Sequence, residues 1–263
     1  MKQAYLTIDD SPTPYTDYIL DALSERGVPA LLFARGDMMD AYGTQSLVRA
    51  VRDGFHIGNH MVTHTRTSTM NFDNVQNEII DMHNRITDIY HAADEQYVPR
   101  YFRFPHMDRG TGGWVIDYNK VPEEYRTFVT SLFADGLNVT LDPPTEAQIE
   151  QKKQVQEFLT SLGYAQPFHN INFPWYQGEM KNAVDCMYTY STSDWMVLNR
   201  HVGKWKYKTI DDLKRKIDDD QSLKDHSSRH IILAHDKDEV GFNQKMIELV
   251  DYFLLKECEF LPF

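Results

Sequence analysis

The 263-residue chain has only two cysteines, Cys186 and Cys258. Two residues fit neither a disulfide scaffold nor the ligand spacing of a zinc finger, so we expect both to be reduced and structural. No apolar run approaches the roughly 18 residues of a membrane span, and the first residues, MKQAYLTIDD, do not resemble a secretory leader. We therefore expect a cytoplasmic protein if Met1 is the native start, and a secreted or periplasmic one if a leader has been removed.

Positive charge is also scarce. The chain has 27 Lys and Arg against 39 Asp and Glu, a formal net charge of −12. Proteins that bind nucleic-acid backbones carry basic patches, so nucleic acid is not an expected partner. The apolar fraction of 41% and the charged fraction of 25% are ordinary for a globular protein. Nothing in the sequence indicates an oligomeric state.

Strand-like and helix-like segments alternate along the chain, as in βαβ units. The expected strands are residues 4–8, 29–36, 55–60, 101–105, 185–192 and 229–236. The expected helices are residues 14–27, 44–54, 71–93, 146–163 and 209–220. No repeat or linker divides the chain, and the pattern predicts an α/β fold with polar clusters at the carboxyl ends of its strands.

Two adjacent carboxylates, Asp9 and Asp10, end the first expected strand in YLTIDDSP. Side chains alternate along a strand, so the two should leave it on opposite sides, and their charges need a cation or hydrogen-bond donors. His60 and His64 in GNHMVTH would share one face of a helical turn and could reach one ion. Position 61 is methionine, which argues against the HExxH metalloprotease helix. One carboxylate and two histidines predict a divalent-metal site, with the second carboxylate left as a base.

Three further residues suit the same chemistry. Arg103 in RFPHMDRG could hold a carboxylate through two nitrogens. Pro105 restrains the chain, so that the amide of His106 could point at an oxyanion. His235 follows a buried strand in IILAHD and is suited to be a general acid.

Taken together, TIDD, HMVTH, RFP, SDW and LAHD resemble the five motifs of the NodB-type polysaccharide deacetylases, carbohydrate esterase family 4, between about residues 4 and 236. The resemblance implies an irregular (β/α) barrel, deformed and seven-stranded, with its site at the carboxyl ends of the strands. It also implies a single domain over residues 1–263, with an inserted or remodelled segment at about 115–185, between the third and fourth motifs.

The resemblance also implies roles for the matched residues. The metal ligands would be Asp10, His60 and His64. The catalytic residues would be Asp9 as general base, His235 as general acid, Arg103 to position Asp9, and His106 to supply an oxyanion-hole amide. The substrate pocket would contain Trp195, Leu233 and Asp194. Whether Asp194 or another residue supports His235 stays open. The expected ion is zinc, although cobalt, nickel or iron would suit the same ligands.

The sequence departs from the family pattern in two motifs. Met61 stands where the family usually has a serine or threonine whose hydroxyl braces the loop, and Ser191 stands where an earlier aspartate is usual. A second alignment places the fourth motif at LGYAQPFHNINFPW, which would replace Trp195 by Trp175.

The function implied by the resemblance is a hydrolase that uses a metal-activated water to remove an N-acetyl group from an acetylated amino sugar in a poly- or oligosaccharide. Within the same chemistry, the alternatives are a deformylase, a ureide amidohydrolase and an O-acetyl esterase. A non-catalytic carbohydrate-binding relative would be expected to lack Asp9 or His235, and both are present. A haloacid-dehalogenase-type phosphatase needs carboxylates separated by one residue, and a non-haem iron oxygenase needs its close pair to be His and a carboxylate. Here the two carboxylates Asp9 and Asp10 are adjacent, and the close pair is the two histidines His60 and His64, so neither alternative is favoured.

Overall fold

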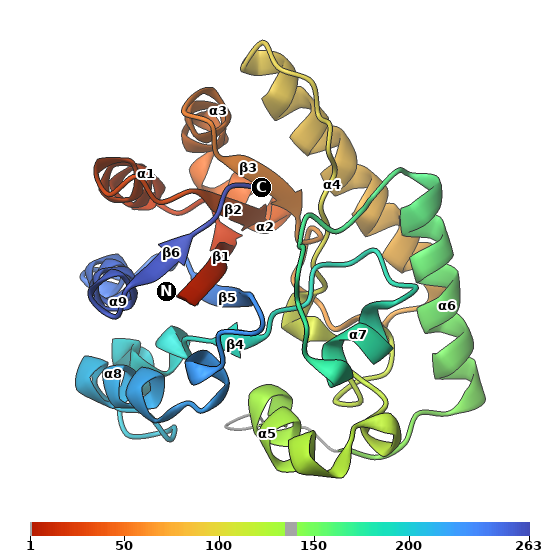
Figure 1. Cartoon of the computed structure of the whole chain (residues 1–263). Helices are drawn as coiled ribbons and strands as arrows, with labels where there is room; N and C mark the ends of the chain where they lie inside the picture. The colour runs from red at the N-terminus through yellow and green to blue at the C-terminus, as the bar shows by residue number, and fades with distance from the viewer. Residues whose placement is uncertain (1, 135–140) are drawn as a thin grey trace.

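A parallel β-sheet forms the centre of the protein in a computed structural model, which describes residues 2–134 and 141–263 (Figure 1). The strands lie in the order β3 (His56–Asn59), β2 (Ala30–Ala34), β1 (Lys2–Ser11), β5 (His230–His235) and β4 (Tyr190–Ser191), and β6 (Cys258–Phe260) pairs with the beginning of β1. All these pairings are parallel, so the carboxyl ends of β1, β2, β3 and β5 lie at one edge of the sheet.

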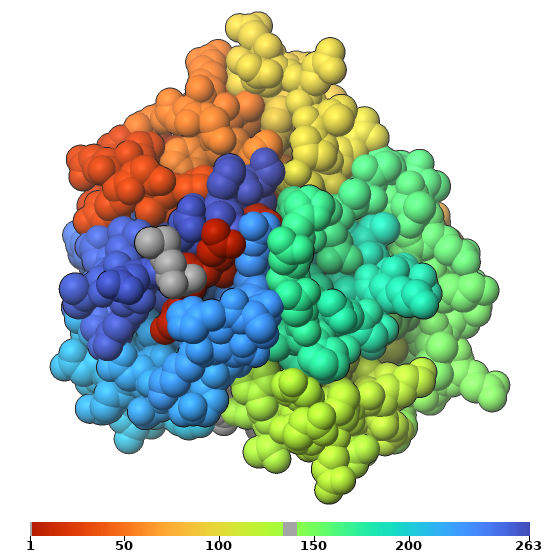
Figure 2. Space-filling model, in the orientation of Figure 1, coloured from red at the N-terminus to blue at the C-terminus, as the bar shows by residue number. Residues whose placement is uncertain are grey.

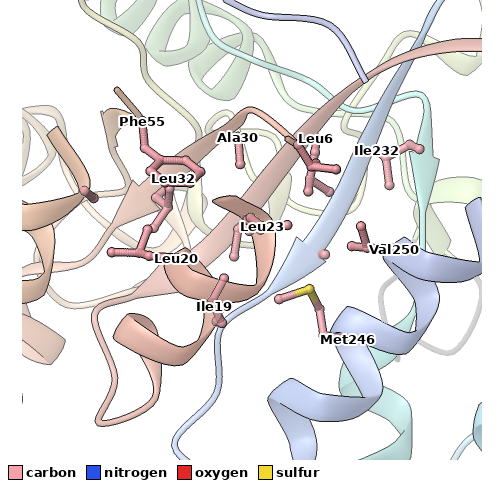
Figure 3. Packing of buried hydrophobic residues seen from close by; sticks show 14 of the residues in the cluster. Leu6, Ile19, Leu20, Leu23, Ala30, Leu32, Phe55, Ile232, Met246 and Val250 are labelled. Carbon is pink, nitrogen blue, oxygen red and sulfur yellow. The ribbon is translucent and has the colours of Figure 1, made fainter. Parts of the chain in front are cut away.

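The central strands β1, β2 and β5 are buried almost throughout, as their continuous apolar sequences predict. Figure 3 shows how helices fill one side: side chains of α1 (Thr16–Glu25) and α9 (Phe242–Leu255) meet Leu6, Leu32 and Ile232 of the strands. The helices α3 (Gln45–Arg52) and α8 (Ile210–Asp219) complete this layer. The short helix α2 (Gly36–Tyr42) follows β2 directly.

The helix α4 (Phe72–Ala92) shares this buried cluster through Met82, Ile86 and Ile89, and it packs beside α6 (Glu146–Ser161) (Figure 1). The segment predicted to be inserted, about 115–185, contains α6 together with α5 (Glu123–Ala134) and α7 (Pro174–Met180), and its residues 135–140 lie outside the described part. Its apolar side chains share a buried cluster with Tyr5, Ile231 and Leu233 of the strands. Figure 2 shows the segment as a continuous surface beside the strands.

The remaining regular elements are short. The 3₁₀ helices of the described residues are Thr67–Thr69, Pro105–Met107, Tyr118–Lys120, Asp194–Val197, Asn199–His201 and Ser222–Lys224. None of the helices among residues 2–134 and 141–263 has both the length and the apolar composition needed to cross a membrane.

The predicted α/β fold with parallel strands is confirmed. The predicted strand at 101–105 is wrong, because this segment does not form a continuous strand pairing. Phe102 forms only an isolated bridge with Asn59, and two backbone hydrogen bonds join the segment to the end of β3. The predicted strand at 185–192 shrinks to Tyr190–Ser191. The strand pairings among the described residues do not show whether the sheet closes on itself. Closure into a barrel therefore stays a prediction. The sequence analysis did not predict α2, α5, α7, α9 or β6.

Candidate metal centre and active site

The two carboxylates lie at the carboxyl end of β1, between β2 and β5. Asp9 continues the ladder, whereas Asp10 has a φ of +73° and shifts the register with β2. Aspartate tolerates this left-handed conformation better than most residues do. The expectation that the two side chains leave on opposite sides is therefore wrong, because both line one cavity. Both are almost fully buried.

His60 and His64 follow β3 and converge on Asp10, but the predicted helical turn is wrong. The segment between them is irregular, and Met61 and His64 have φ values of +61° and +54°. The side chain of Asn59 holds this backbone by accepting a hydrogen bond from the Met61 N–H at 2.9 Å. Local left-handed residues, rather than helical spacing, bring the imidazoles together.

Met61 removes the expected hydroxyl brace, and a carboxylate of α4 takes over that role. Glu78 accepts hydrogen bonds from the backbone N–H groups of residues 62 and 63, at 3.1 and 3.0 Å. The Met61 side chain is fully buried and packs in an apolar cluster with α4 and α6. The loop is therefore braced by packing and by Glu78.

Asp10, His60 and His64 form a site that can hold a metal ion. One ligand atom from each lies within 4.8 Å of the other two. The Oδ1 atom of Asp10 is 3.4 Å from His64 Nε2 and 3.9 Å from His60 Nε2. His60 Nδ1 is 2.8 Å from the carbonyl oxygen of Arg103, an arrangement in which Nδ1 carries the proton and Nε2 is left as the ligand atom.

The protonation of these groups also suits a cation. Burial lowers the pKa of His64 to about 2 and lowers that of His60, so both imidazoles are neutral ligands near pH 7. Burial alone would raise the pKa of Asp10, but the positive charges around it, of which Lys237 has the largest effect, hold it well below its usual value. An anionic oxygen and two neutral imidazole nitrogens are the donor set of many catalytic divalent-metal sites.

Asp9 is held by Arg103, which is fully buried. Arg103 Nη1 donates to Asp9 Oδ1 and to Thr7 Oγ1, both at 2.8 Å, and its Nε donates to the Cys186 carbonyl at 2.8 Å. The predicted two-nitrogen grip is wrong, because a single guanidinium nitrogen reaches the carboxylate. This leaves Asp9 Oδ2 on the side of His60, 3.6 Å from its Nε2.

On the neighbouring strand β5, beside Asp9, His235 pairs with Asp194. His235 Nδ1 lies 2.7 Å from Asp194 Oδ1, and the His235 backbone N–H donates to Asp194 Oδ2 at 2.8 Å. Asp194 is 1% exposed and does not line the cavity. The assignment of Asp194 to the substrate pocket is therefore corrected: it orients His235 and leaves Nε2 of that ring for the cavity.

The cavity that joins these groups has a volume of about 260 Å³. Trp195, Leu233 and His106 line it, together with Phe133 from the segment at 115–185 and Tyr188 just after it. A larger hollow of about 520 Å³ shares Tyr188, Ser191 and Trp195 with this cavity, and one of about 770 Å³ lies elsewhere. The lining residues of neither hollow include the acids and histidines described above. The chemistry of the lining, rather than size, identifies the candidate site.

The geometry favours SDW as the fourth motif. Trp195 reaches the cavity, whereas Trp175 is buried among aromatic and aliphatic side chains of α5 and α7. His106 has a φ of +54° at the start of a short 3₁₀ helix, and its imidazole also lines the cavity, 4.3 Å from the ring of His64.

The sequence analysis missed two cations on Asp10. Arg35 Nη1 donates to Asp10 Oδ1 at 3.0 Å, and Lys237 Nζ donates to Asp10 Oδ2. Both follow strands that flank β1, in ALLFARG and LAHDK. Because parallel neighbouring strands end at the same edge, these positions could have been recognised as partners for the carboxylate pair.

Comparisons with known proteins agree with this geometry. The model of the family described as polysaccharide deacetylase matches residues 1–112. A chitooligosaccharide deacetylase of Bradyrhizobium sp. (strain ANU 289) is 32% identical over 117 residues, which are 44% of this chain and 49% of that protein. The chain spans about half the length of such curated relatives.

Solved structures extend the likeness of the fold to the whole chain. A family 4 carbohydrate esterase from Streptomyces lividans, in complex with acetate, has a TM-score of 0.55 at 18% identity and covers 98% of this chain and 91% of that one. The catalytic domain of a peptidoglycan N-acetylglucosamine deacetylase from Eubacterium rectale ATCC 33656 has a TM-score of 0.59 at 15% identity, covering 100% and 88%. The predicted resemblance to the NodB-type polysaccharide deacetylases of carbohydrate esterase family 4 is confirmed by the family match at residues 1–112, and the solved structures show that the whole chain shares their fold.

Proposed function

We propose that the protein is a metal-dependent hydrolase that removes the N-acetyl group from an acetylated amino sugar in an oligo- or polysaccharide. The observation that carries this proposal is that one cavity holds the candidate metal ligands together with two acid–base groups, Asp9 paired with Arg103 and His235 paired with Asp194. The relatives named as chitooligosaccharide and peptidoglycan N-acetylglucosamine deacetylases support the substrate class.

Asp10, His60 and His64 would hold the ion, which is expected to be zinc. A divalent ion in such a site lowers the pKa of a bound water toward neutrality and polarises a carbonyl oxygen. Asp9 then accepts the proton of the attacking water, since Arg103 fixes one of its oxygens and leaves the other beside His60. The amide of His106, held in its left-handed turn, is the proposed donor to the developing oxyanion.

His235 is the proposed acid for the leaving nitrogen. Asp194 accepts the Nδ1–H of His235, which presents Nε2 to the cavity and stabilises the protonated ring by its charge. Proton transfer from Nε2 to the nitrogen breaks the C–N bond and releases acetate and a free amine. Trp195 and Leu233 would enclose the acetyl methyl, and the cavity of about 260 Å³ is slightly smaller than the pockets of roughly 300–1,000 Å³ that hold drug-sized ligands.

We also propose that residues 115–185 belong to the same domain as the site. Phe133 lines the cavity, and Asp185 accepts a hydrogen bond at 2.9 Å from Nη2 of Arg109, which follows the third motif. This segment would then shape the sugar-binding side of the active site.

Acetate release tests the proposal. The purified protein, loaded with zinc, is incubated with chitooligosaccharides, peptidoglycan fragments and acetylated xylan, with and without a chelator. We expect acetate from an N-acetylated sugar, and loss of release with the chelator. Release from xylan alone would favour an O-acetyl esterase, and no acetate from any of the three would contradict the proposal and favour formyl or ureide chemistry.

Two variants sharpen this experiment. Asp9→Asn should keep the zinc stoichiometry of the wild type in isothermal titration but lose turnover, because Asp9 is outside the ligand set. Asp238→Asn is a matched control, since Asp238 is a half-exposed carboxylate near the cavity that contacts only Arg200 and Tyr42 among its described partners. Full activity of Asp9→Asn would remove the assignment of the base.

A further inference from the structure

The proposed metal ligand Asp10 carries two cationic partners, and this arrangement is separate from the acid–base pairs described above. Arg35 donates to its Oδ1 atom and Lys237 donates to its Oδ2 atom. The adjacent carboxylate, Asp9, accepts a hydrogen bond from Arg103. Its described contacts include neither Arg35 nor Lys237. The carboxylate expected to bind the ion is therefore the one with two positive groups already attached.

The two oxygens of Asp10 face different directions. Oδ1 is the oxygen nearest to His64 and His60, at 3.4 and 3.9 Å from their Nε2 atoms. Lys237 contacts the other oxygen. The ammonium group can therefore stay on Oδ2 while Oδ1 and the imidazoles hold a cation, so Lys237 acts beside the metal site without occupying it.

Both cations are fixed and shielded. Arg35 is gripped by Asp37, which accepts from its Nε at 3.1 Å and from its Nη2 at 2.6 Å. The backbone of Lys237 is held on both sides by the amide of Asn243, a buried residue at the start of α9. The side chains of Arg35 and Lys237 are each 15% exposed. Charges so little exposed interact more strongly than charges in open water.

This charge arrangement has a defined consequence for a cation. A metal ligand normally contributes negative charge that offsets the charge of the ion. Here Lys237 and Arg35 offset the charge of Asp10 first, and each repels a divalent ion at Oδ1. Arg35 is itself compensated by Asp37, whereas Asp10 is the only carboxylate that contacts the ammonium of Lys237 in the described residues.

We propose that Lys237 is a positioning residue that tunes the metal centre: it fixes Asp10 through Oδ2 and, by its charge, weakens the affinity of the site for a divalent ion. The inference rests on the metal centre of the proposed function, but not on the identity of the substrate. Because Lys237 offsets the charge of Asp10, the ligands would neutralise less of the charge of a bound ion. Such an ion would polarise the carbonyl oxygen of a substrate more strongly, and the site would bind it less tightly.

Zinc titration of the full chain, without substrate, tests this inference. Lys237→Gln keeps a hydrogen-bond donor and removes the charge, Lys237→Met removes both, and Lys237→Arg keeps the charge. We expect at least tenfold tighter zinc binding in Lys237→Gln and Lys237→Met, and a Kd within threefold of the wild type in Lys237→Arg. Circular dichroism confirms that each variant is folded before it is titrated.

Lys153→Gln is the matched control for the loss of one positive charge, because Lys153 lies on the exposed face of α6 and outside the metal-binding cavity. Its zinc affinity should equal that of the wild type. Unchanged or weaker binding in Lys237→Gln overturns the inference, as does equal tightening in Lys153→Gln. Failure to release acetate from any sugar would contradict the proposed function while leaving this ranking of zinc affinities intact.

Discussion

Replacing Asp194 by Asn separates the orientation of His235 from the stabilisation of its charge. The carboxylate accepts the Nδ1–H of His235 at 2.7 Å, the His235 backbone N–H at 2.8 Å and the Trp195 N–H at 2.9 Å. Asparagine has a similar shape but only one acceptor oxygen, so at least one of these donors must face an NH₂ group. The variant also has no negative charge for the protonated imidazole.

The size of the effect follows from the burial of the pair. Two unit charges about 4 Å apart attract by about 4 kcal/mol at an effective dielectric constant of 20, which is a suitable value near a protein surface. If His235 is protonated in the rate-limiting transition state, loss of this attraction lowers kcat by about a thousandfold, since each 1.36 kcal/mol is a factor of ten. The unmatched buried donor should also lower the free energy of unfolding by about 1–3 kcal/mol.

Three measurements on Asp194→Asn test this reasoning: acetate release at saturating zinc, zinc affinity, and urea unfolding. We expect kcat to fall by two to four orders of magnitude and zinc affinity to stay at the wild-type value, because Asp194 is not one of the ligands. Asp238→Asn, measured in parallel, should stay within a factor of two. Activity of Asp194→Asn within threefold of the wild type would refute the role of the pair, and lost zinc binding would show that Asp194 supports the metal centre instead.

Three further substitutions test the packing and charge around the site. Arg103→Met leaves Asp9 buried without its cation and should lower the free energy of unfolding by about 3–5 kcal/mol in urea titrations; a loss below 1 kcal/mol would contradict the pairing. Gly58→Ala places a Cβ atom 2.6 Å from the ring of Phe33, which is fully buried, and should destabilise the fold by about 1–3 kcal/mol, whereas an unchanged urea midpoint would disprove the close approach. Burial lowers the pKa of His230 to about 4. Because the unfolded chain takes up that proton near pH 6.5, stability should fall as the pH drops from 7 to 5, by about 2 kcal/mol more in the wild type than in His230→Gln. Equal pH dependence in the two proteins would contradict the assignment.

The sequence predicted the chemistry of the site better than its local geometry. Asp9, Asp10 and His235 lie at the ends of strands whose apolar sequences identify them, and parallel strands end at a common edge. The i,i+4 spacing of His60 and His64 suggested a helical turn, but the loop uses left-handed residues instead. That conformation depends on Asn59 and on Glu78 from a distant helix, which local spacing does not reveal.

Other differences have the same cause, a partner that is distant in the sequence. The resemblance placed Asp194 in the substrate pocket, whereas the fold turns it toward His235, 41 residues away. The segment 101–105 has the composition of a strand, but its main-chain groups divide their hydrogen bonds between the end of β3 and Cys186. Residues 123–134 and 174–180 were not predicted as helices, and only their apolar side chains are buried, in a cluster that they share with one another and with the strands.

Anomalous diffraction at the zinc absorption edge, from crystals grown with zinc, tests the central claim most directly. The predicted result is one strong peak within bonding distance of an Asp10 oxygen and the Nε2 atoms of His60 and His64, with Asp9 outside the coordination shell. No peak at these residues, or a peak held by Asp9 instead of Asp10, would contradict the division of the carboxylate pair into ligand and base.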